Sequence, residues 1–358
     1  MQNSKPLVVI VGGFLGAGKT TLILCAAGML GRQGTRVAVI TNDQGQDLVD
    51  TYRVRASGID AAEIGGGCFC CQFSAFIDAV EHVMQYQPEV IFAEPVGSCT
   101  DLVATVVEPL QSLYAHRFRL APFTVLVDPA IARRATRVGS DAAFRFLFES
   151  QVREADVLCY TKADQYSQFP QIEGEEPLHV SATTGEGVRD WLRLLTGWTG
   201  QCGKHPLDID YDEYAAAEAA LGWLNAHLDL DLTVPASPAR IVGPLLDQLD
   251  TQLSIAGAAI AHLKLFDQTD SSYLKAGIVQ NGQEPAVEGD LLAPAERKHN
   301  LIINLRAIGN PEVLRRIVTD ALRDIPGDHK VQIQSFSPAY PKPERRMAAG
   351  ASPAKHGD

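Results

Sequence analysis

The sequence predicts an α/β fold, in which a mostly parallel sheet is covered by helices on both faces and is followed by a smaller α+β domain. Up to about residue 200, short and continuously apolar segments alternate with helical segments, as in parallel sheets that are buried on both sides. Over residues 224–234, apolar and polar residues alternate, as in a half-buried antiparallel strand. A glycine-rich turn between the first predicted strand and the first predicted helix favours a phosphate-binding loop.

Composition divides the chain into four parts. We expect an α/β domain over residues 1–200 and a smaller α+β domain over 208–334, joined by a polar, glycine-containing linker over 201–207. Pro, Ala, Lys and Arg dominate residues 335–358, which predicts a disordered tail.

The predicted elements of each domain follow in chain order. Apolar segments of the first domain predict strands at 7–11, 36–41, 89–93, 123–127, 157–160 and 178–180, with helices at 20–30, 74–86, 102–114, up to about 153, and 187–195. In the second domain, strands are expected at 224–234, 262–266, 274–279 and 301–307, and helices at 240–255 and 311–323. Residues 211–222 are rich in Ala and fit either a helix or a strand.

Charge and cysteine content restrict the class of protein. The chain has 31 basic and 43 acidic residues, a formal net charge of −12, which argues against nucleic acid or an anionic membrane surface as the main partner. We find neither an apolar run of transmembrane length nor the layout of a signal peptide, so we expect a cytoplasmic protein. Seven cysteines in 358 residues do not indicate a disulfide framework.

The strongest motif lies between the first strand and the first helix. Residues 13–20 read GFLGAGKT and fit the pattern G-x-x-x-x-G-K-[ST] at every fixed position. In this pattern, backbone N–H groups form a concavity at a helix N-terminus, the lysine reaches the β- and γ-phosphates, and the hydroxyl binds Mg²⁺. The predicted phosphate contacts are Gly13, Gly16, Ala17, Gly18, Lys19, Thr20 and Thr21.

Two further loops indicate that the base is guanine. Thr161-Lys162-Ala163-Asp164 follows a strand and resembles the guanine-recognition motif Asn-Lys-x-Asp, with Thr161 in place of Asn. The Asp164 carboxylate can accept from N1–H and the 2-amino group of guanine, a donor pair that adenine lacks, while the stem of Lys162 lies along the base. Ser181 and Ala182 begin a segment that resembles the loop whose backbone N–H groups read guanine O6. A plain surface turn is the alternative for residues 161–164.

Acidic residues at strand ends are candidates for holding Mg²⁺. Glu94 ends a strand where P-loop NTPases place such a carboxylate, and Gly97 can offer its N–H to a γ-phosphate. Asp43 follows the second strand and is a second candidate, although Asn-Asp and Gln-Gly are also ordinary turn residues. Glu94 also has an ordinary explanation as an acidic strand cap. We therefore assign Thr20, Asp43 and Glu94 to magnesium, and expect Lys19, Thr20 and Glu94 to act in catalysis.

Three cysteines lie within four positions. Cys68, Cys70 and Cys71 follow three glycines, and a Cys-x-Cys-Cys sequence suggests thiolate binding of Zn²⁺, Cu(I) or a similar soft ion. A redox pair or plain buried cysteines are the alternatives. The remaining cysteines stand singly in apolar surroundings and are interpreted as core residues: Cys25, Cys99, Cys159 and Cys202.

These motifs together resemble the metallochaperone GTPases typified by CobW, a family of P-loop NTPases related to UreG and HypB. Residues 13–21 match that family's P-loop, residues 63–71 (EIGGGCFCC) resemble its cysteine segment with Gly66 in place of Asn, and Glu94-x-x-Gly97 matches its second switch. The resemblance covers about residues 6–197 and is looser beyond them. The His-rich stretch of many members is absent from the sequence.

The resemblance implies a GTPase whose nucleotide state controls metal binding at the three cysteines. The implied cofactors are GTP, Mg²⁺ and a transition metal, Zn²⁺ or Co²⁺. The implied partner is a client metalloprotein or a cobalamin- or corrinoid-related enzyme, recognised by the C-terminal domain, with a homodimer as a further possibility and no role for nucleic acid or membranes. Two alternatives remain: a P-loop kinase of a small metabolite with structural cysteines, and a non-enzymatic metal- or corrinoid-binding module.

Overall fold

A computed structural model describes residues 5–42, 54, 58–172 and 176–347 of the protein. Contacts within the chain divide these residues into two compact units. Unit 1 contains the residues up to Ala217 together with those from Pro341 onward, and unit 2 is Glu218–Tyr340. Within the described ranges, no helix is long and apolar enough to cross a membrane.

Unit 1 is built on a parallel sheet whose main strands follow the order β3-β2-β4-β1-β6-β7-β8. Every strand pair in it is parallel, and β5 pairs with the start of β1. The central strand β1 is buried along its whole length, which explains its continuously apolar sequence. The strands are β1 (Leu7–Gly13), β2 (Val37–Asn42), β3 (Asp60–Ile64), β4 (Val90–Glu94), β5 (Arg119–Leu120), β6 (Thr124–Val127), β7 (Val157–Tyr160) and β8 (Leu178–His179).

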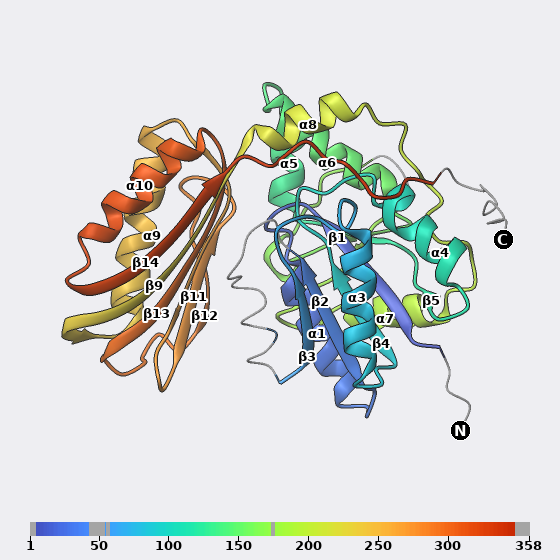
Figure 1. The fold of residues 1–358 in the computed structure, drawn as a ribbon, viewed down its shortest axis with the longest axis horizontal. Coiled ribbons are helices and arrows are strands. Elements are labelled where there is room, and N and C mark those ends of the chain that lie inside the picture. The colour runs from blue at the N-terminus through green and yellow to red at the C-terminus, as the bar shows by residue number, and fades with distance from the viewer. Residues whose placement is uncertain (1–4, 43–53, 55–57, 173–175, 348–358) are drawn as a thin grey trace. The chain divides into compact units, whose positions relative to one another are not determined.

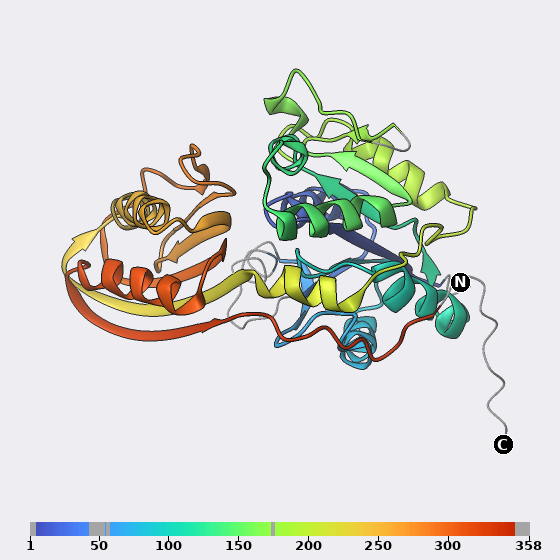
Figure 2. The same ribbon diagram turned by 90° about the horizontal axis from the view of Figure 1, so that it is seen from above.

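Helices cover the sheet of unit 1 (Figures 1 and 2). Side chains of α1 and α7 share one buried apolar cluster with β1, β2 and β4, whereas α3 and α6 contact the sheet outside that cluster. The α/β fold predicted from the sequence is thus confirmed. The helical elements are α1 (Lys19–Gly31), α3 (Phe73–Met84), the π-helix η1 (Val103–Val107), α4 (Glu108–Tyr114), α5 (Pro129–Thr136), α6 (Ala142–Glu154), the 3₁₀ turn η2 (Ala163–Gln165), α7 (Val188–Gly197) and α8 (Tyr211–Ala219).

Unit 2 is a six-stranded sheet in the order β12-β11-β10-β13-β9-β14, antiparallel at every pair. Two helices pack on it and share one apolar core with the strands (Figure 1). This is the α+β arrangement that the sequence predicts. The elements are β9 (Leu221–Ala236), α9 (Pro238–Ile255), β10 (Ala259–Gln268), β11 (Tyr273–Ile278), β12 (Ala286–Gly289), β13 (Glu296–Ile308), α10 (Pro311–Arg323) and β14 (Gly327–Phe336).

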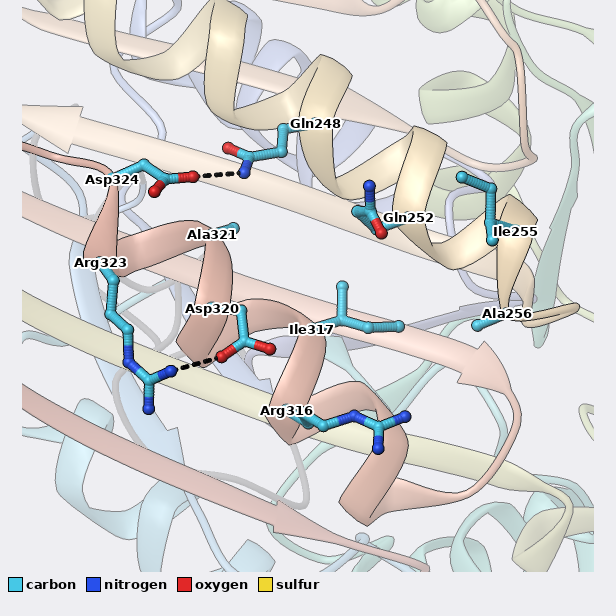
Figure 3. A pocket seen from close by; sticks show the side chains of 10 residues that line it. All are labelled: Gln248, Gln252, Ile255, Ala256, Arg316, Ile317, Asp320, Ala321, Arg323 and Asp324. Carbon is cyan, nitrogen blue, oxygen red and sulfur yellow. Dashed lines mark hydrogen bonds and ion pairs between the residues drawn. The ribbon is translucent and has the colours of Figure 1, made fainter.

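A surface pocket lies where α9 and α10 run side by side (Figure 3). Gln248 Nε2 donates to Asp324 Oδ2 at 2.8 Å across it, and Arg323 pairs with Asp320 at 2.7 Å along α10. Four of the polar side chains of the lining are therefore bonded in two pairs.

Two segments differ from their predicted character. β14 runs to Phe336, and residues within 341–347 form hydrogen bonds with other parts of unit 1. The predicted disorder of 335–358 is therefore wrong over 335–347. Residues 348–358 lie outside the described residues. The segment proposed as a linker is fixed as well, because the Asp156 carboxylate accepts from the backbone N–H of Gly203 at 2.7 Å and of Lys204 at 2.9 Å. Both segments are held in place by hydrogen bonds to residues that are distant in the sequence.

A buried His–Asp pair in unit 2 predicts how stability depends on pH. His299 Nδ1 lies 2.8 Å from Asp267 Oδ2, and both side chains are inaccessible to solvent. Burial lowers the pKa of His299, but the hydrogen bond to Asp267 and the charge of Asp267 raise it by a larger amount. The net result is a pKa above 6.5. Burial raises the pKa of Asp267 above 3.8, against the hydrogen bond of His299.

Both shifts mean that the folded state binds protons more tightly than the unfolded chain, so the free energy of unfolding falls as pH rises. The contribution of His299 is complete below pH 6.5 and is lost as pH rises through its folded pKa. We expect this decline in urea unfolding measured between pH 6 and 9, and expect Asp267→Asn to remove it. Asp231→Asn, at an exposed carboxylate on the same sheet that pairs with Arg297, is the matched control. An unchanged slope in Asp267→Asn would contradict the assignment.

Candidate nucleotide and metal site

The glycine-rich loop joins β1 to α1 in the geometry of a phosphate cradle. Gly18 precedes α1 with φ 88°, and no side chain caps the helix N-terminus. Gly13 has φ 132°, and a Cβ there would collide with the carbonyl oxygen of Leu126 on the neighbouring strand. The N-terminus of α1 therefore meets the glycine-rich loop without a side-chain cap, and the strand packing leaves no room for a side chain at Gly13.

Lys19 and Thr20 begin α1 and face the end of β4. Lys19 Nζ donates to the carbonyl oxygen of Gly13 at 2.9 Å, and Thr20 Oγ1 donates to Glu94 Oε2 at 2.8 Å. All three side chains are buried. Thr20 thus lies beside Glu94, and the Lys19 side chain contacts the glycine-rich loop. A hydroxyl and a carboxylate side by side are oxygen donors of the kind that Mg²⁺ binds. Asp43, the other predicted magnesium residue, lies outside the described residues.

The segment after β4 packs directly on the glycine-rich loop. A Cβ on Gly97 would lie 3.0 Å from Leu15 N and 3.1 Å from Leu15 Cα, so only glycine allows this approach. Gln151 of α6 fixes the same segment, because its Nε2 donates to the carbonyl oxygens of Gly97 at 3.0 Å and Cys99 at 2.9 Å. Leu15 of the loop and the segment that follows Glu94 are therefore in direct contact.

The two predicted base-binding loops lie next to each other. Thr161 follows β7, and Ser181 comes after the adjacent strand β8; Ala163 N donates to Val180 O at 3.2 Å between them. Asp164 is exposed and Ser181 is buried. Ala182 is partly buried beside Ser181 in the same loop.

The sequence analysis missed the residue that holds Lys162 in place. Lys162 has φ 55°, and its Nζ pairs with Asp128 Oδ2 at 2.6 Å. Asp128 is fully buried, and its Oδ1 also accepts from Tyr166 Oη at 3.1 Å. The lysine stem is thus fixed beside Asp164, and only the position of Asp128 at the end of β6 could have indicated this role.

The three clustered cysteines form a turn before α3. Their sulfur atoms all lie within 4.8 Å of one another, with Cys68 Sγ 2.7 Å from Cys70 Sγ and Cys70 Sγ 3.8 Å from Cys71 Sγ. Cys71 N and Gln72 N both donate to the carbonyl oxygen of Cys68, at 3.0 Å and 2.9 Å, which closes the turn. Among the described residues, this is the one group of at least three Cys, His, Asp or Glu side chains close enough to share a metal ion.

The cluster favours ionisation of one thiol in particular. Hydrogen bonds from Cys70, Cys71 and Cys99 hold the pKa of Cys68 well below its usual value of 9.0. The hydrogen bond to Cys68 raises the pKa of Cys70, and the same contact raises that of Cys71 to about 12. Within the cluster, Cys68 is therefore the thiol that ionises most readily.

Asn42 anchors the cysteine turn and was not singled out in the sequence. This residue ends β2, and its Nδ2 donates to the carbonyl oxygens of Ile64 at 2.9 Å and Gly67 at 2.6 Å. Phe69 N, in turn, donates to Asn42 Oδ1 at 3.0 Å. The residue whose side chain holds the cysteine turn thus immediately precedes Asp43 in the sequence.

Glu344, in the segment that follows unit 2, contacts the cysteine turn and the start of α3. Glu344 N donates to the Cys70 carbonyl oxygen at 3.2 Å, and Glu344 Oε2 accepts from Ser74 N at 2.8 Å at the start of α3. Two positions further on, Arg346 Nε pairs with Asp101 Oδ2 at 2.9 Å. Asp101 is buried with φ 61°, so this ion pair holds a strained backbone position.

Comparison with known proteins gives one family. The family model described as CobW/HypB/UreG, nucleotide-binding domain, matches residues 7–179. The zinc chaperone CobW of Pseudomonas aeruginosa is 26% identical over 298 residues, which cover 72% of this chain and 77% of that protein. The zinc chaperone YeiR of Escherichia coli is 27% identical over 229 residues, covering 61% of this chain and 63% of that protein.

Among solved structures, Zn(II)-bound YjiA GTPase from Escherichia coli aligns over 90% of this chain and 99% of its own, with 16% identity and a TM-score of 0.33. The matched family region of this chain contains the glycine-rich loop, Glu94, Gly97, the cysteine turn and Lys162 with Asp164. Residues 7–179 are therefore similar to the nucleotide-binding domain of the CobW/HypB/UreG family.

Proposed function

We propose that this protein is a cytoplasmic GTPase that binds a transition metal ion, foremost Zn²⁺, at Cys68, Cys70 and Cys71 and releases it to a client according to its nucleotide state. The observation that carries the proposal is a three-thiol turn, held by Asn42 at the end of β2, in the same unit as the glycine-rich loop and the Thr20–Glu94 pair. The match of residues 7–179 to the CobW/HypB/UreG nucleotide-binding domain and the similarity to zinc chaperones support it.

Each part of the nucleotide has a proposed partner in unit 1. The N-terminal N–H groups of α1 and the Lys19 ammonium hold the β- and γ-phosphates, and Thr20 and Glu94 supply oxygen ligands for Mg²⁺, which neutralises charge on the phosphates when bound. Asp43 is a further proposed ligand. No described residue at the site stands out as a base for the attacking water, so we expect slow hydrolysis that a partner or a dimer contact accelerates.

The cysteine turn is suited to a soft ion taken up as cargo. With Zn–S bonds of about 2.3 Å, two thiolates on one tetrahedral Zn²⁺ lie about 3.8 Å apart. The separation of Cys70 and Cys71 already matches, and that of Cys68 and Cys70, at 2.7 Å, has to widen by about 1 Å when the ion enters. Co²⁺ fits the same donors with the same geometry. Delivery to a client metalloprotein or a cobalamin-related enzyme through unit 2 completes the proposal.

Measuring phosphate transfer tests this function against its alternatives. Under single-turnover conditions with GTP and Mg²⁺, we expect GDP and inorganic phosphate as the products, with water as the acceptor. Transfer of phosphate to a small metabolite would indicate a P-loop kinase, and the absence of any turnover would indicate a binding module. The same reaction with ATP is expected to be slower.

Asp164→Asn is expected to weaken GTP binding at least tenfold. The carboxylate accepts from two guanine donors, and an amide can accept only one of them, which leaves a donor unpaired at a cost of about 1–3 kcal/mol. Titration with a fluorescent GDP analogue measures the change. Because Asp164 is exposed, its loss is not expected to destabilise the fold. Asp190→Asn, at an exposed position on α7, is the matched control. Unchanged affinity in Asp164→Asn would refute guanine recognition by this residue.

A further inference from the structure

Residues 341–347, which follow β14 in the chain, lie against the rest of unit 1 beside the cysteine turn (Figure 2). They form neither helix nor strand, and we call them the terminal strap. Hydrogen bonds, one ion pair and one contact with an aromatic ring hold the strap in place. The strap can therefore leave unit 1 without breaking a sheet or a helix.

Glu344 fastens the terminal strap to the cysteine turn. Its N–H donates to the carbonyl oxygen of Cys70 at 3.2 Å, and its Oε2 accepts from N and Oγ of Ser74 at 2.8 Å and 2.7 Å. Because no side chain at the N-cap position caps α3, the Glu344 carboxylate takes that role from a distant part of the chain. The guanidinium of Arg345 lies over the ring of Phe73, 5.6 Å from its centroid. The strap thus binds the backbone of a proposed metal ligand and the helix that follows it.

Arg346 fastens the strap at a second place, the segment after β4. Its Nε donates to Asp101 Oδ2 at 2.9 Å, and Tyr211 Oη donates to the same oxygen at 2.5 Å. The next residue, Met347, donates its N–H to the carbonyl oxygen of Ala104 at 2.8 Å. Asp101 is fully buried, so an open strap leaves a buried carboxylate without its cation. This cost favours the closed position of the strap.

The inner thiols of the turn are shielded from solvent. Cys68 is 4% exposed and Cys70 is 2% exposed, whereas Cys71 is partly exposed, so an ion reaches all three sulfurs only when a neighbouring segment moves. Asn42 at the end of β2, the start of α3 and the terminal strap all hold the turn. Of these three segments, the strap alone belongs to no helix or strand.

We propose that the terminal strap is a gate on the metal site, which opens to let the ion enter or leave and closes over the turn afterwards. Opening also frees the backbone of Cys70 from Glu344, as the separation of the Cys68 and Cys70 sulfurs from 2.7 Å to about 3.8 Å on Zn²⁺ requires. The inference rests on the proposed function, since it concerns how fast the metal ion exchanges at the site proposed there.

The rates of Co²⁺ uptake and release test the gate. Uptake is followed by stopped-flow through the sulfur-to-metal absorption of the full-length protein, and release by transfer of Co²⁺ to excess EDTA. We expect Glu344→Ala and Arg346→Ala each to raise both rates about tenfold, because loss of a charged hydrogen bond increases the open population by about that factor. The strap closes over the turn before and after the ion enters, so the Co²⁺ dissociation constant is expected to change less than about threefold.

Matched substitutions in unit 2 are the controls. Glu312→Ala removes an exposed carboxylate from the first turn of α10, and Arg323→Ala removes an exposed arginine paired with Asp320. Both are expected to exchange Co²⁺ at the wild-type rates. Urea unfolding of every variant is measured alongside, and Glu344→Ala, at an exposed contact, keeps the test valid if Arg346→Ala unfolds.

Two results would overturn the gate while leaving the metal carrier intact. One is exchange at wild-type rates in Glu344→Ala. The other is a loss of Co²⁺ affinity with no increase in the uptake rate, which would make the strap a structural support of the turn. A wild-type protein that takes up no Co²⁺ and no Zn²⁺ would overturn the proposed function together with the gate.

Discussion

Lys19→Ala is expected to abolish GTP hydrolysis, with a loss of at least about 100- to 1,000-fold in turnover, the usual effect of removing one preorganised donor to the developing charge. Lys19 Nζ lies at the loop that cradles the phosphates, where it donates to the carbonyl oxygen of Gly13 at 2.9 Å. With nucleotide bound, the same ammonium group is expected to turn to the β- and γ-phosphates. Phosphate release under single-turnover conditions measures the effect.

Loss of activity in Lys19→Ala has to be separated from loss of structure, because Lys19 is buried. Urea unfolding is expected to show one transition close to that of the wild type, since the variant removes a charge whose main role is in nucleotide binding. Lys162→Ala, at the base-binding loop, is expected to weaken GTP affinity while keeping turnover at saturating GTP. Turnover at the wild-type rate in Lys19→Ala would refute the phosphate-loop assignment.

Replacing both Cys68 and Cys70 by Ser is expected to reduce Zn²⁺ affinity at least about 100-fold, because the site loses two thiolate ligands. Even substitution of a residue that only hydrogen-bonds to a metal ligand lowers metal affinity by about 10- to 100-fold. GTP binding is expected to persist, since the thiols take no part in the phosphate cradle. Competition with a chromophoric chelator measures the affinity. The double variant Cys25→Ser with Cys202→Ser, outside the cluster, is the matched control. If the Cys68 and Cys70 double variant bound Zn²⁺ as tightly as the wild type, the metal would have to bind outside the cysteine turn.

The sequence predicts well those features that depend on neighbouring residues. Residues 13–20 form a contiguous motif, so the phosphate loop could be placed at once, and the apolar run of β1 predicts a strand buried on both faces. Strands β3 and β14 were missed because exposed or polar residues interrupt their apolar pattern, as is usual for strands at the edge of a sheet.

Contacts between distant segments could not be predicted from the sequence. In the sequence, Asn42 looks like an ordinary turn residue. Only the structure shows its three hydrogen bonds to the end of β3 and to the cysteine turn with the glycine before it. Arg346 belongs to a polar terminal segment, and its order depends on the buried Asp101 carboxylate.

The central claim is that the nucleotide controls the metal. The most direct test compares the Zn²⁺ affinity of the protein saturated with a non-hydrolysable GTP analogue and with GDP, each in the presence of Mg²⁺. Coupling of about 1–3 kcal/mol predicts roughly 5- to 150-fold tighter Zn²⁺ binding in the GTP-analogue state, and Zn²⁺ is then expected to tighten binding of the analogue by the same factor. Equal Zn²⁺ affinity in the two states would contradict a nucleotide-controlled metal carrier and leave a GTPase with an uncoupled metal site.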